Sequence, residues 1–244
     1  MAENHAVVDF PDLWLFDFDR TLAILEPVVD WAQSRRELEI ELRAAKLPPA
    51  LLEELIAAIP RGNLPLYEAL RARLLDAPAT SQPLVDGAEA RAILARASAL
   101  IERHELAGVD RAAPLPGALA LLRALRARRS ASAVVTSNSS RTVARWLADH
   151  RAAELVSVVV GRDRGLALKP SPATVHCALA LCEHRGAIFV GDSDADYRAA
   201  RAAELRFIGI ASDPERRAQL AALGASQPDL FDSPAAVAAA FGLL

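Results

Sequence analysis

The chain opens with one apolar strand and then changes to a helical pattern of apolar positions. Leu13 to Phe18 is a short apolar run of the kind that forms a buried strand. Apolar residues then recur at three- and four-residue spacing in four segments, which we predict as helices at 28–46, 49–59, 64–75 and 85–106. Breaks that contain proline or glycine, such as Pro48-Pro49 and Pro60 to Asn63, separate these segments. The pattern therefore predicts a helical insertion behind the first strand.

From Pro116 onward, short β-rich runs alternate with amphipathic helices. We predict strands at 131–135, 156–160, 187–190 and 206–210, and helices that end at residue 128 or cover 141–150, 172–183 and 195–203. Such alternation is typical of parallel βαβ units. The predicted fold is α/β, with one domain formed by residues 1–23 and 114–244 and an all-helical domain formed by residues 24–113. The predicted linkers between them are residues 23–27 and 111–116.

Clusters of carboxylates follow two of the predicted strands. Asp17 and Asp19 stand two residues apart at the end of the first strand, where the alternation of side chains would point both to one face. Two unpaired carboxylates in contact repel by about 4 kcal/mol at an effective dielectric near 20, so a cation, a shared proton or open water must offset the cost. An isolated Asp-x-Asp pair usually marks a solvated turn, but a second cluster, Asp192 to Asp196, follows the apolar run 187–191. The two clusters together predict a metal site.

Two further polar segments stand where a strand ends or a helix begins. Thr136 to Ser139 follows the predicted strand 131–135, and Lys169 precedes a helical segment. In open α/β sheets, ligands bind in the crevice beyond the carboxyl ends of the strands. We therefore expect the four polar segments to form one site.

These segments, taken in order, resemble the four motifs of the haloacid dehalogenase superfamily of phosphatases and phosphotransferases. The matching residues are Asp17-Phe18-Asp19-Arg20-Thr21, Thr136, Lys169 and Gly191-Asp192-Ser193-Asp194-Ala195-Asp196. The resemblance spans the whole chain and implies the Rossmann-like, doubly wound parallel sheet of this superfamily. It also identifies the helical insertion as a cap domain, as in the phosphoglycolate phosphatase and β-phosphoglucomutase-like members.

One residue departs from the superfamily pattern. The position after the second aspartate is usually Gly, whereas this chain has Arg20. A side chain at this position implies that the local backbone needs no conformation reserved for glycine. Arg20 also brings a long cation next to the site, and we count it, with Thr21, among the residues expected to bind substrate.

The resemblance implies a role for each acidic residue. Asp17 is the expected nucleophile, which forms an aspartyl phosphate. Asp19 is the expected acid for the leaving alkoxide and the base that activates water. The implied cofactor is Mg²⁺, which prefers oxygen ligands. Its expected ligands are the Asp17 carboxylate, the Asp19 main-chain carbonyl and Asp192, with Asp196 binding through water or orienting the others.

The resemblance assigns the transferring phosphoryl group to the second and third motifs. Thr136 supplies its hydroxyl, helped by the backbone amides of Ser137 and Asn138. Ser137 is the alternative source of this hydroxyl. Lys169 neutralises the phosphate and holds Asp17 in line for attack.

Arg61 lies in a break of the helical insertion, residues 60–65, that is bounded by prolines and contains a glycine. Such a loop has a defined, tight backbone course. In capped members of the superfamily a cap loop closes over the substrate, so we expect Arg61 to bind a carboxylate or hydroxyl of the substrate. The alternative is an ordinary solvated turn between two helices.

The motifs favour a Mg²⁺-dependent phosphatase that acts on a small phosphorylated metabolite. A sugar phosphomutase shares every core motif and stays open as the alternative. A haloacid dehalogenase would need neither Asp19 nor the metal. A phosphonate hydrolase would lack an acid at Asp19 and carry a lysine in the cap, where Lys46 is the one lysine of the insertion. The intact acids also argue against a non-catalytic scaffold.

Composition narrows the range of partners. The formal net charge of −3 gives no electrostatic support for binding nucleic acid or an anionic membrane. No stretch approaches the roughly 20 apolar residues that a membrane span requires, and Met1 to Asp12 has no signal-peptide pattern. We expect a cytoplasmic protein that acts as a monomer or a homodimer.

Overall fold

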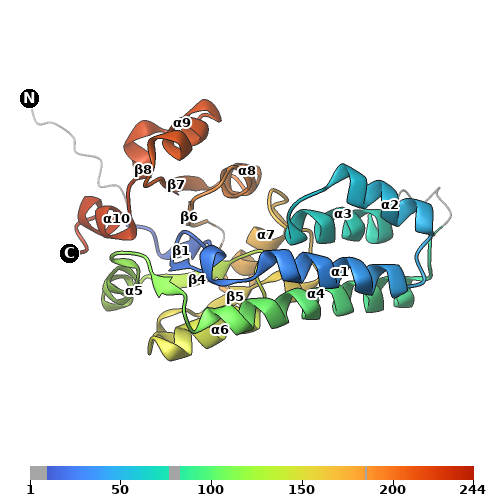
Figure 1. The fold of residues 1–244 in the computed structure, drawn as a ribbon. Helices are drawn as coiled ribbons and strands as arrows, with labels where there is room; N and C mark the ends of the chain where they lie inside the picture. Colours follow the sequence, from blue (N-terminus) through green and yellow to red (C-terminus); the bar gives the residue numbers. More distant parts are fainter. Residues whose placement is uncertain (1–9, 77–82, 185) are drawn as a thin grey trace, which may run out of the picture.

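The computed structural model describes residues 10–76, 83–184 and 186–244 (Figure 1). Within these residues, six parallel strands form one sheet in the order β5-β4-β1-β6-β7-β8. The strands are β1 (Leu13–Phe16), β4 (Ala131–Val135), β5 (Val158–Val160), β6 (Ile188–Gly191), β7 (Arg206–Ile210) and β8 (Leu230–Phe231). β1 pairs with β4 on one side and with β6 on the other, and all of its residues are buried. The first motif therefore emerges from the middle of the sheet.

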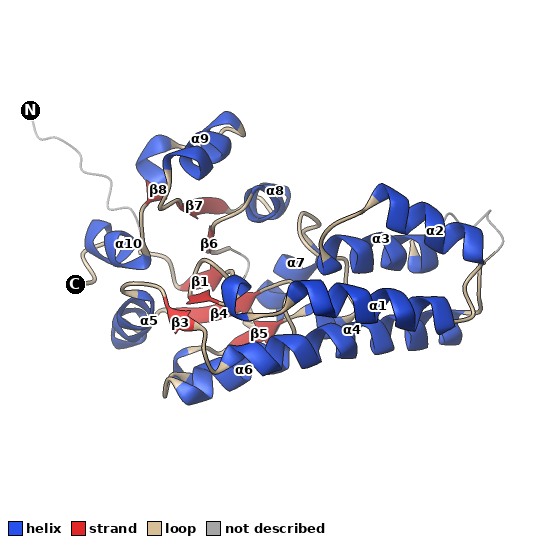
Figure 2. Ribbon diagram, in the orientation of Figure 1, coloured by secondary structure: helices blue, strands red, loops and turns tan. Residues whose placement is uncertain are grey.

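Helices cover both faces of the sheet (Figure 2). The face that carries Trp14 and Phe16 packs against α5 (Ala118–Ala127), α6 (Ser140–Asp149) and α10 (Pro234–Ala240). The face that carries Leu13 and Leu15 packs against α7 (Ala173–Leu181), α8 (Asp194–Ala202) and α9 (Pro214–Ala222). Side chains alternate between faces along a strand, so successive residues of β1 join different apolar clusters. This is the predicted doubly wound α/β architecture.

A helical insertion follows β1. Its helices are α1 (Trp31–Ala44), α2 (Pro49–Ala58), α3 (Asn63–Leu75) and α4 (Gly87–Val109). In Figure 1 they extend to one side of the sheet. They share an apolar cluster of their own, to which the fully buried Leu38, Leu66 and Ile101 belong. The predicted all-helical insertion is confirmed, although observed helix ends differ from the predicted ones by as much as three residues.

The two segments that connect the sheet with the insertion pair with each other. β2 (Ala23–Ile24) runs antiparallel to β3 (Ala113–Pro114). A 3₁₀ helix, η1 (Glu26–Val28), follows β2. The sequence predicts both segments as plain linkers, because a strand of two residues is too short to show alternation. The pairing joins the two connections into one unit at the base of the insertion.

Beyond residue 210 no element is predicted from the sequence, whereas the structure continues with α9, η4 (Gln227–Asp229), β8 and α10. α10 is rich in alanine, which gives little contrast between apolar and polar positions. Two more 3₁₀ helices, η2 (Ala153–Leu155) and η3 (Arg162–Arg164), flank β5. Among the described helices, none combines the length and the apolar character needed to cross a lipid bilayer.

Candidate active site

Carboxylates from two neighbouring strands meet at one end of the sheet. Asp17 follows β1, Asp192 follows β6, and Asp196 lies in the first turn of α8. Each of the three residues is buried and offers a carboxylate oxygen, and these oxygens lie within 4.8 Å of one another. The pairing of β1 with β6 brings together segments that are far apart in the chain. The structure thus unites the two acidic clusters that the sequence shows separately.

Lys169 lies against these carboxylates from the loop before α7. Its Nζ donates to Asp17 Oδ1 at 2.6 Å and to the Val135 carbonyl at 3.1 Å, and it forms an ion pair with Asp196. Burial by itself lowers the pKa of the ammonium, but the charges of Asp17 and Asp196 outweigh it, so the pKa of Lys169 lies above its ordinary value. Lys169 is therefore a permanent cation between the first and the last motif.

The single positive charge of Lys169 does not balance the negative charges of the three carboxylates, as the pKa values of Asp17 and Asp192 indicate. Burial raises the pKa of Asp17 well above its ordinary value, against the opposing charge of Lys169. Burial also raises the pKa of Asp192 to about 7, with Asp196 adding to the effect and Arg216 opposing it. These shifts mean that protein groups alone do not fully stabilise the ionised forms. Buried carboxylate oxygens within reach of one another have the ligand chemistry of a hard divalent cation.

Asp196 is held by the backbone around it. Its Oδ2 accepts hydrogen bonds from the amides of Asp192 at 3.2 Å and Ser193 at 3.0 Å and from the Ser193 hydroxyl at 2.7 Å. Gly191 is required nearby, since a Cβ at this position would lie 2.6 Å from the Cβ of Asp196. Asp196 Oδ1 pairs with Lys169. Both carboxylate oxygens of Asp196 are thus occupied by protein groups. The hydrogen bonds to Oδ2 fix the backbone that carries Asp192.

Asp19 lies apart from this group of three carboxylates. β1 ends at Phe16, so the alternation that is expected to point Asp17 and Asp19 to one face does not extend to them. Asp19 Oδ1 accepts hydrogen bonds from the amides of Leu25 at 2.8 Å and Glu26 at 3.1 Å. Burial raises the pKa of Asp19, and these two amides oppose the shift. A partly buried carboxyl with a raised pKa is suited to exchange protons with a substrate.

The backbone at Arg20 is left-handed, with φ at 62°. Glycine favours this region, but the region is not reserved for glycine, since four other non-glycine residues of the described chain also have positive φ. The chain turns tightly here, because the Phe18 carbonyl accepts hydrogen bonds from the amides of Leu22 at 2.9 Å and Ala23 at 3.0 Å. A non-glycine residue in the left-handed region raises the conformational free energy of the folded chain by about 1 to 2 kcal/mol. The turn imposes this conformation whichever residue stands there.

Two arginines contact Asp192. Arg20 Nε lies 3.7 Å from Asp192 Oδ2, and Arg20 Nη1 lies 3.2 Å from Glu26 Oε2. Arg216 of α9 is closer, with Nη1 3.0 Å from Asp192 Oδ2 and 3.0 Å from the Asp192 carbonyl oxygen. Nothing in the sequence singles out Arg216, which lies beyond the last predicted element in an arginine-rich chain. α9 packs against α8, and this packing places Arg216 beside Asp192.

The polar segment after β4 forms a compact turn. Thr136 Oγ1 donates to Asn138 Oδ1 at 3.1 Å and accepts from the Asn138 amide at 3.1 Å. Thr136 and Asn138 are buried, whereas Ser137 is partly exposed. β4 is the neighbour of β1, and the Val135 carbonyl is bonded to Lys169. The second and third motifs therefore meet beside the first.

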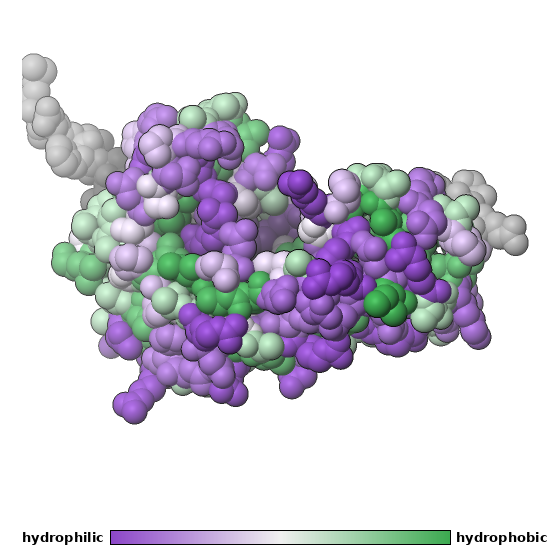
Figure 3. Space-filling view, viewed as in Figure 1, coloured by the Kyte–Doolittle hydropathy of each residue, from purple (hydrophilic) through white to green (hydrophobic). Residues whose placement is uncertain are grey.

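Two other predicted substrate-binding residues form no side-chain hydrogen bond with the described residues. Thr21 is fully buried, and its Oγ1 finds no hydrogen-bond partner in the described part of the chain. Arg61 is exposed in the turn between α2 and α3. Arg35 of α1 holds this turn by donating to the carbonyls of Gly62 at 2.8 Å and Ile59 at 2.7 Å. The turn lies at the end of the insertion nearest the sheet in Figure 1, and Figure 3 shows the surface hollowed between the two parts.

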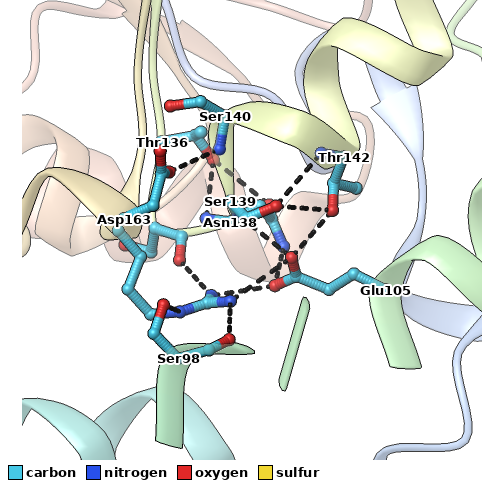
Figure 4. Close-up of polar contacts among 10 residues, drawn as sticks. Ser98, Glu105, Thr136, Asn138, Ser139, Ser140, Thr142 and Asp163 are labelled. Carbon is cyan, nitrogen blue, oxygen red and sulfur yellow. Dashed lines mark hydrogen bonds and ion pairs between the residues drawn. The ribbon is translucent and has the colours of Figure 1, made fainter. Parts of the chain in front are cut away.

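A buried ion pair lies behind the segment Thr136 to Asn138. Glu105 of α4 and Arg162 of η3 are both 0% exposed, with Arg162 Nη1 2.9 Å from Glu105 Oε1. Figure 4 shows the polar contacts around Glu105. Neither residue is among those that the sequence predicts for the site. A signal for Glu105 exists, because it interrupts the buried face of α4 between Ile101 and Val109.

Comparison with known proteins points to one family. Residues 81–210 match the family model described as haloacid dehalogenase-like hydrolase. A phosphoglycolate phosphatase of Pseudomonas putida is 28% identical over 202 residues, which are 82% of this chain and 69% of the relative. A phosphoglycolate phosphatase of Pseudomonas syringae pv. tomato matches with the same identity and coverage.

Solved structures share the fold. A putative phosphoglycolate phosphatase from Lactobacillus plantarum superposes with a TM-score of 0.60 at 19% identity, covering 94% of this chain and 99% of the other. CbbY from Rhodobacter sphaeroides, in complex with xylulose-1,5-bisphosphate, superposes with a TM-score of 0.56 at 24% identity, covering 93% and 96%. Both likenesses include the helical insertion as well as the sheet.

Proposed function

Because the chain belongs to the haloacid dehalogenase-like hydrolase family and is a phosphatase, we propose that it hydrolyses a small phosphorylated metabolite through an aspartyl phosphate on Asp17. The observation that carries this proposal is the contact between Lys169 Nζ and Asp17 Oδ1, at 2.6 Å. The contact occupies one oxygen of the carboxylate. The other, Oδ2, receives no hydrogen bond from the described residues and is available for attack. A nucleophile held in one direction lowers the entropic cost of reaching the phosphorus.

The proposed reaction has two steps. Asp17 attacks the phosphorus, the bond from phosphorus to the leaving oxygen breaks, and Asp19 gives its proton to that oxygen. Asp19, now a carboxylate, then takes a proton from a water molecule that attacks the aspartyl phosphate. The bond between phosphorus and Asp17 breaks, and inorganic phosphate leaves. Lys169 stays protonated throughout and offsets the charge on the phosphoryl oxygens.

The carboxylate cluster supports Mg²⁺ as the cofactor. Asp192 Oδ1 receives no hydrogen bond or ion pair from the described residues, and Asp17 offers a carboxylate oxygen to the same cluster, so both side chains can bind a cation. We assign these two carboxylates and the main-chain carbonyl of Asp19 as ligands. Asp196 orients Asp192, because protein groups already occupy both of its oxygens. Bound Mg²⁺ offsets the carboxylate charges and polarises the phosphoryl oxygens.

We expect removal of the metal to remove activity. Without the cation the carboxylates repel the substrate phosphate, so hydrolysis of p-nitrophenyl phosphate should fall by at least about 100-fold in excess chelator. Added Mg²⁺ should restore it and should raise the Tm, because a ligand that binds only the folded state stabilises that state. Undiminished activity in chelator, with no effect of Mg²⁺ on the Tm, would remove the metal from the mechanism.

We assign the transferring phosphoryl group to Thr136, Ser137 and Asn138. The Ser137 amide and the Thr136 hydroxyl are the proposed donors, and the nearby Lys169 supplies the positive charge. The Asn138 amide, also expected as a donor, is directed at Thr136 Oγ1, and the Thr136 hydroxyl must turn from Asn138 Oδ1 to reach the phosphoryl group. Thr136 is preferred because it directly follows the strand residue whose carbonyl binds Lys169. Ser137 remains the alternative, since its side chain is the exposed one of the two.

The roles of Arg20 and Thr21 also remain proposals. The ion pairs of Arg20 with Asp192 and Glu26 support a role in holding the Asp192 carboxylate, together with Arg216. Thr21 has no described contact that points to the substrate, and its part in substrate binding stays a prediction from the motif.

Arg61 is the proposed determinant of substrate choice. Its guanidinium is exposed and forms no ion pair with the described residues, in a turn that Arg35 holds in place. A guanidinium recognises a carboxylate through two parallel hydrogen bonds. The two Pseudomonas relatives are phosphoglycolate phosphatases, so 2-phosphoglycolate is the first metabolite to assay.

Arg61→Ala should affect the metabolite and spare a small generic substrate. A contact remote from the phosphorus acts only on the substrate that reaches it. We expect kcat/KM for the best metabolite to fall by at least about tenfold, or about 1.4 kcal/mol, with little change for p-nitrophenyl phosphate. Arg73→Ala, at the other end of α3, is the matched control and should change neither. Equal losses of kcat/KM on both substrates, or no loss on either, would show that Arg61 does not select the substrate and that the loop is an ordinary turn.

A further inference from the structure

Glu105 and Arg162 form an ion pair that is fully removed from solvent. Both side chains are 0% exposed, and Arg162 Nη1 lies 2.9 Å from Glu105 Oε1. A buried pair of charges is weak support for stability, since apolar residues of similar size usually serve equally well. Because stability alone does not explain this pair, we consider which other groups its two side chains bind.

The Glu105 carboxylate binds the segment that follows β4. It accepts hydrogen bonds from Asn138 Nδ2, the Ser139 amide and Thr142 Oγ1, each at 3.0 Å. Figure 4 shows these donors converging on Glu105 from the turn and from the start of α6. Together with Arg162 they use both carboxylate oxygens. The side chain of Asn138 in turn accepts from Thr136 Oγ1, so a continuous chain of hydrogen bonds runs from α4 to the Thr136 hydroxyl.

Arg162 fixes the direction of one peptide group in the same segment. Its Nη1 donates to the Ser137 carbonyl at 2.8 Å, and its Nε and Nη2 donate to the hydroxyl and the carbonyl of Ser98 at 3.2 and 3.3 Å. The carbonyl and the following amide of a trans peptide point in opposite directions. Binding of the Ser137 carbonyl by Arg162 therefore turns the Asn138 amide the other way, toward Thr136 Oγ1.

Helix α4 connects this arrangement with the helical insertion. Ile93, Ala97 and Ile101 of α4 belong to the apolar cluster of the insertion, and Glu105 lies one turn further along. The same helix therefore packs inside the insertion at one end and holds the segment after β4 at the other. A shift of α4 must therefore move the Glu105 carboxylate, which accepts hydrogen bonds from Asn138 Nδ2 and from the Ser139 amide.

We propose that Glu105 and Arg162 are positioning residues, which hold the turn from Thr136 to Asn138 in the shape in which it binds the transferring phosphoryl group. The proposal rests on the proposed function, because it assumes that this segment binds phosphate. Positioned donors stabilise a phosphoryl group without the cost of reorganising them during the reaction. The pair also ties the phosphate-binding segment to the insertion that carries Arg61.

Glu105→Gln tests the proposal. The variant keeps the size of the side chain and loses the charge that orders the donors. We expect the Kd for inorganic phosphate, measured by calorimetry with saturating Mg²⁺, to rise by about tenfold or more. The midpoint of Mg²⁺ activation should stay within about twofold of wild type. A purely structural role would lower the Tm and leave the phosphate Kd of the folded protein unchanged, and that result would overturn the proposal.

A second variant decides the question if Glu105→Gln does not fold. Ser98→Ala removes one partner of Arg162 without leaving a charge unpaired, and we expect the phosphate Kd to rise by about threefold. Ser34→Ala is the matched control, since Ser34 is also buried in a helix of the insertion, α1, and its hydroxyl binds none of the described residues. Equal phosphate Kd values for the two serine variants would overturn the proposal. Failure of the wild-type protein to bind phosphate or to hydrolyse any phosphate ester would instead overturn the proposed function.

Discussion

Asparagine in place of Asp17 abolishes turnover. An amide is too weak a nucleophile to form the acyl phosphate, so kcat should fall by about 10⁴-fold or more, equivalent to about 5 kcal/mol. The assay is release of inorganic phosphate from p-nitrophenyl phosphate. In parallel, acid quench after mixing with radiolabelled substrate measures the phosphoenzyme, which the variant should not form.

A matched control separates loss of the nucleophile from loss of a carboxylate near β1. Asp12→Asn changes an exposed residue just before the same strand and should retain wild-type activity. If Asp17→Asn still accumulates a phosphoenzyme, another residue is the nucleophile, and the role assigned to the contact with Lys169 is wrong.

Asp19→Asn should slow the reaction at a different step. The variant cannot protonate the leaving oxygen or activate water, and loss of a general acid and base costs about 10² to 10⁴-fold in rate. p-Nitrophenol leaves without a proton, so the phosphoenzyme should still form and then break down slowly. Rapid mixing should therefore show a burst of p-nitrophenol and a trapped phosphoenzyme. A variant that neither bursts nor traps phosphate would show that Asp19 acts before the aspartyl phosphate forms.

The fate of the phosphoryl group separates a phosphatase from a phosphomutase. In a phosphatase, water takes the group, and each substrate molecule consumed releases one inorganic phosphate. In a phosphomutase, the group passes to a second sugar phosphate, and release of inorganic phosphate falls short of substrate consumption. The ratio of the two rates, measured with 2-phosphoglycolate and with sugar phosphates, distinguishes them.

Most of the sheet is predictable from the chain. The predicted strands 131–135 and 206–210 coincide with β4 and β7. Both are apolar runs bounded by polar or turn-forming residues, and burial on the two faces of a parallel sheet requires such runs. β2 and β8, with two residues each, show no periodicity and form because a neighbouring strand offers its free backbone groups.

The turn after β1 shows a property that depends on the surrounding fold. The residue type at Arg20 gives no sign of the left-handed backbone that the structure has there, with φ at 62°. Hydrogen bonds from the amides of Leu22 and Ala23 to the Phe18 carbonyl close the turn. The contacts of Asp19 depend on the same turn, which carries its carboxylate to the amides of Leu25 and Glu26 at the start of η1.

The sequence by itself determined which residues stand at the carboxyl ends of the strands, because strand periodicity and the polar residue that ends a run are local properties of the chain. Asp17, Asp19 and Asp192 are residues of this kind, whereas Lys169 stands in a loop before a helix and was identified by the resemblance to a known family. Only the tertiary structure decided how Arg216 meets Asp192 and how Glu105 meets Arg162. These contacts join segments whose approach depends on helix packing across the sheet and the insertion, and neither helical nor strand periodicity carries information about a partner in a distant segment.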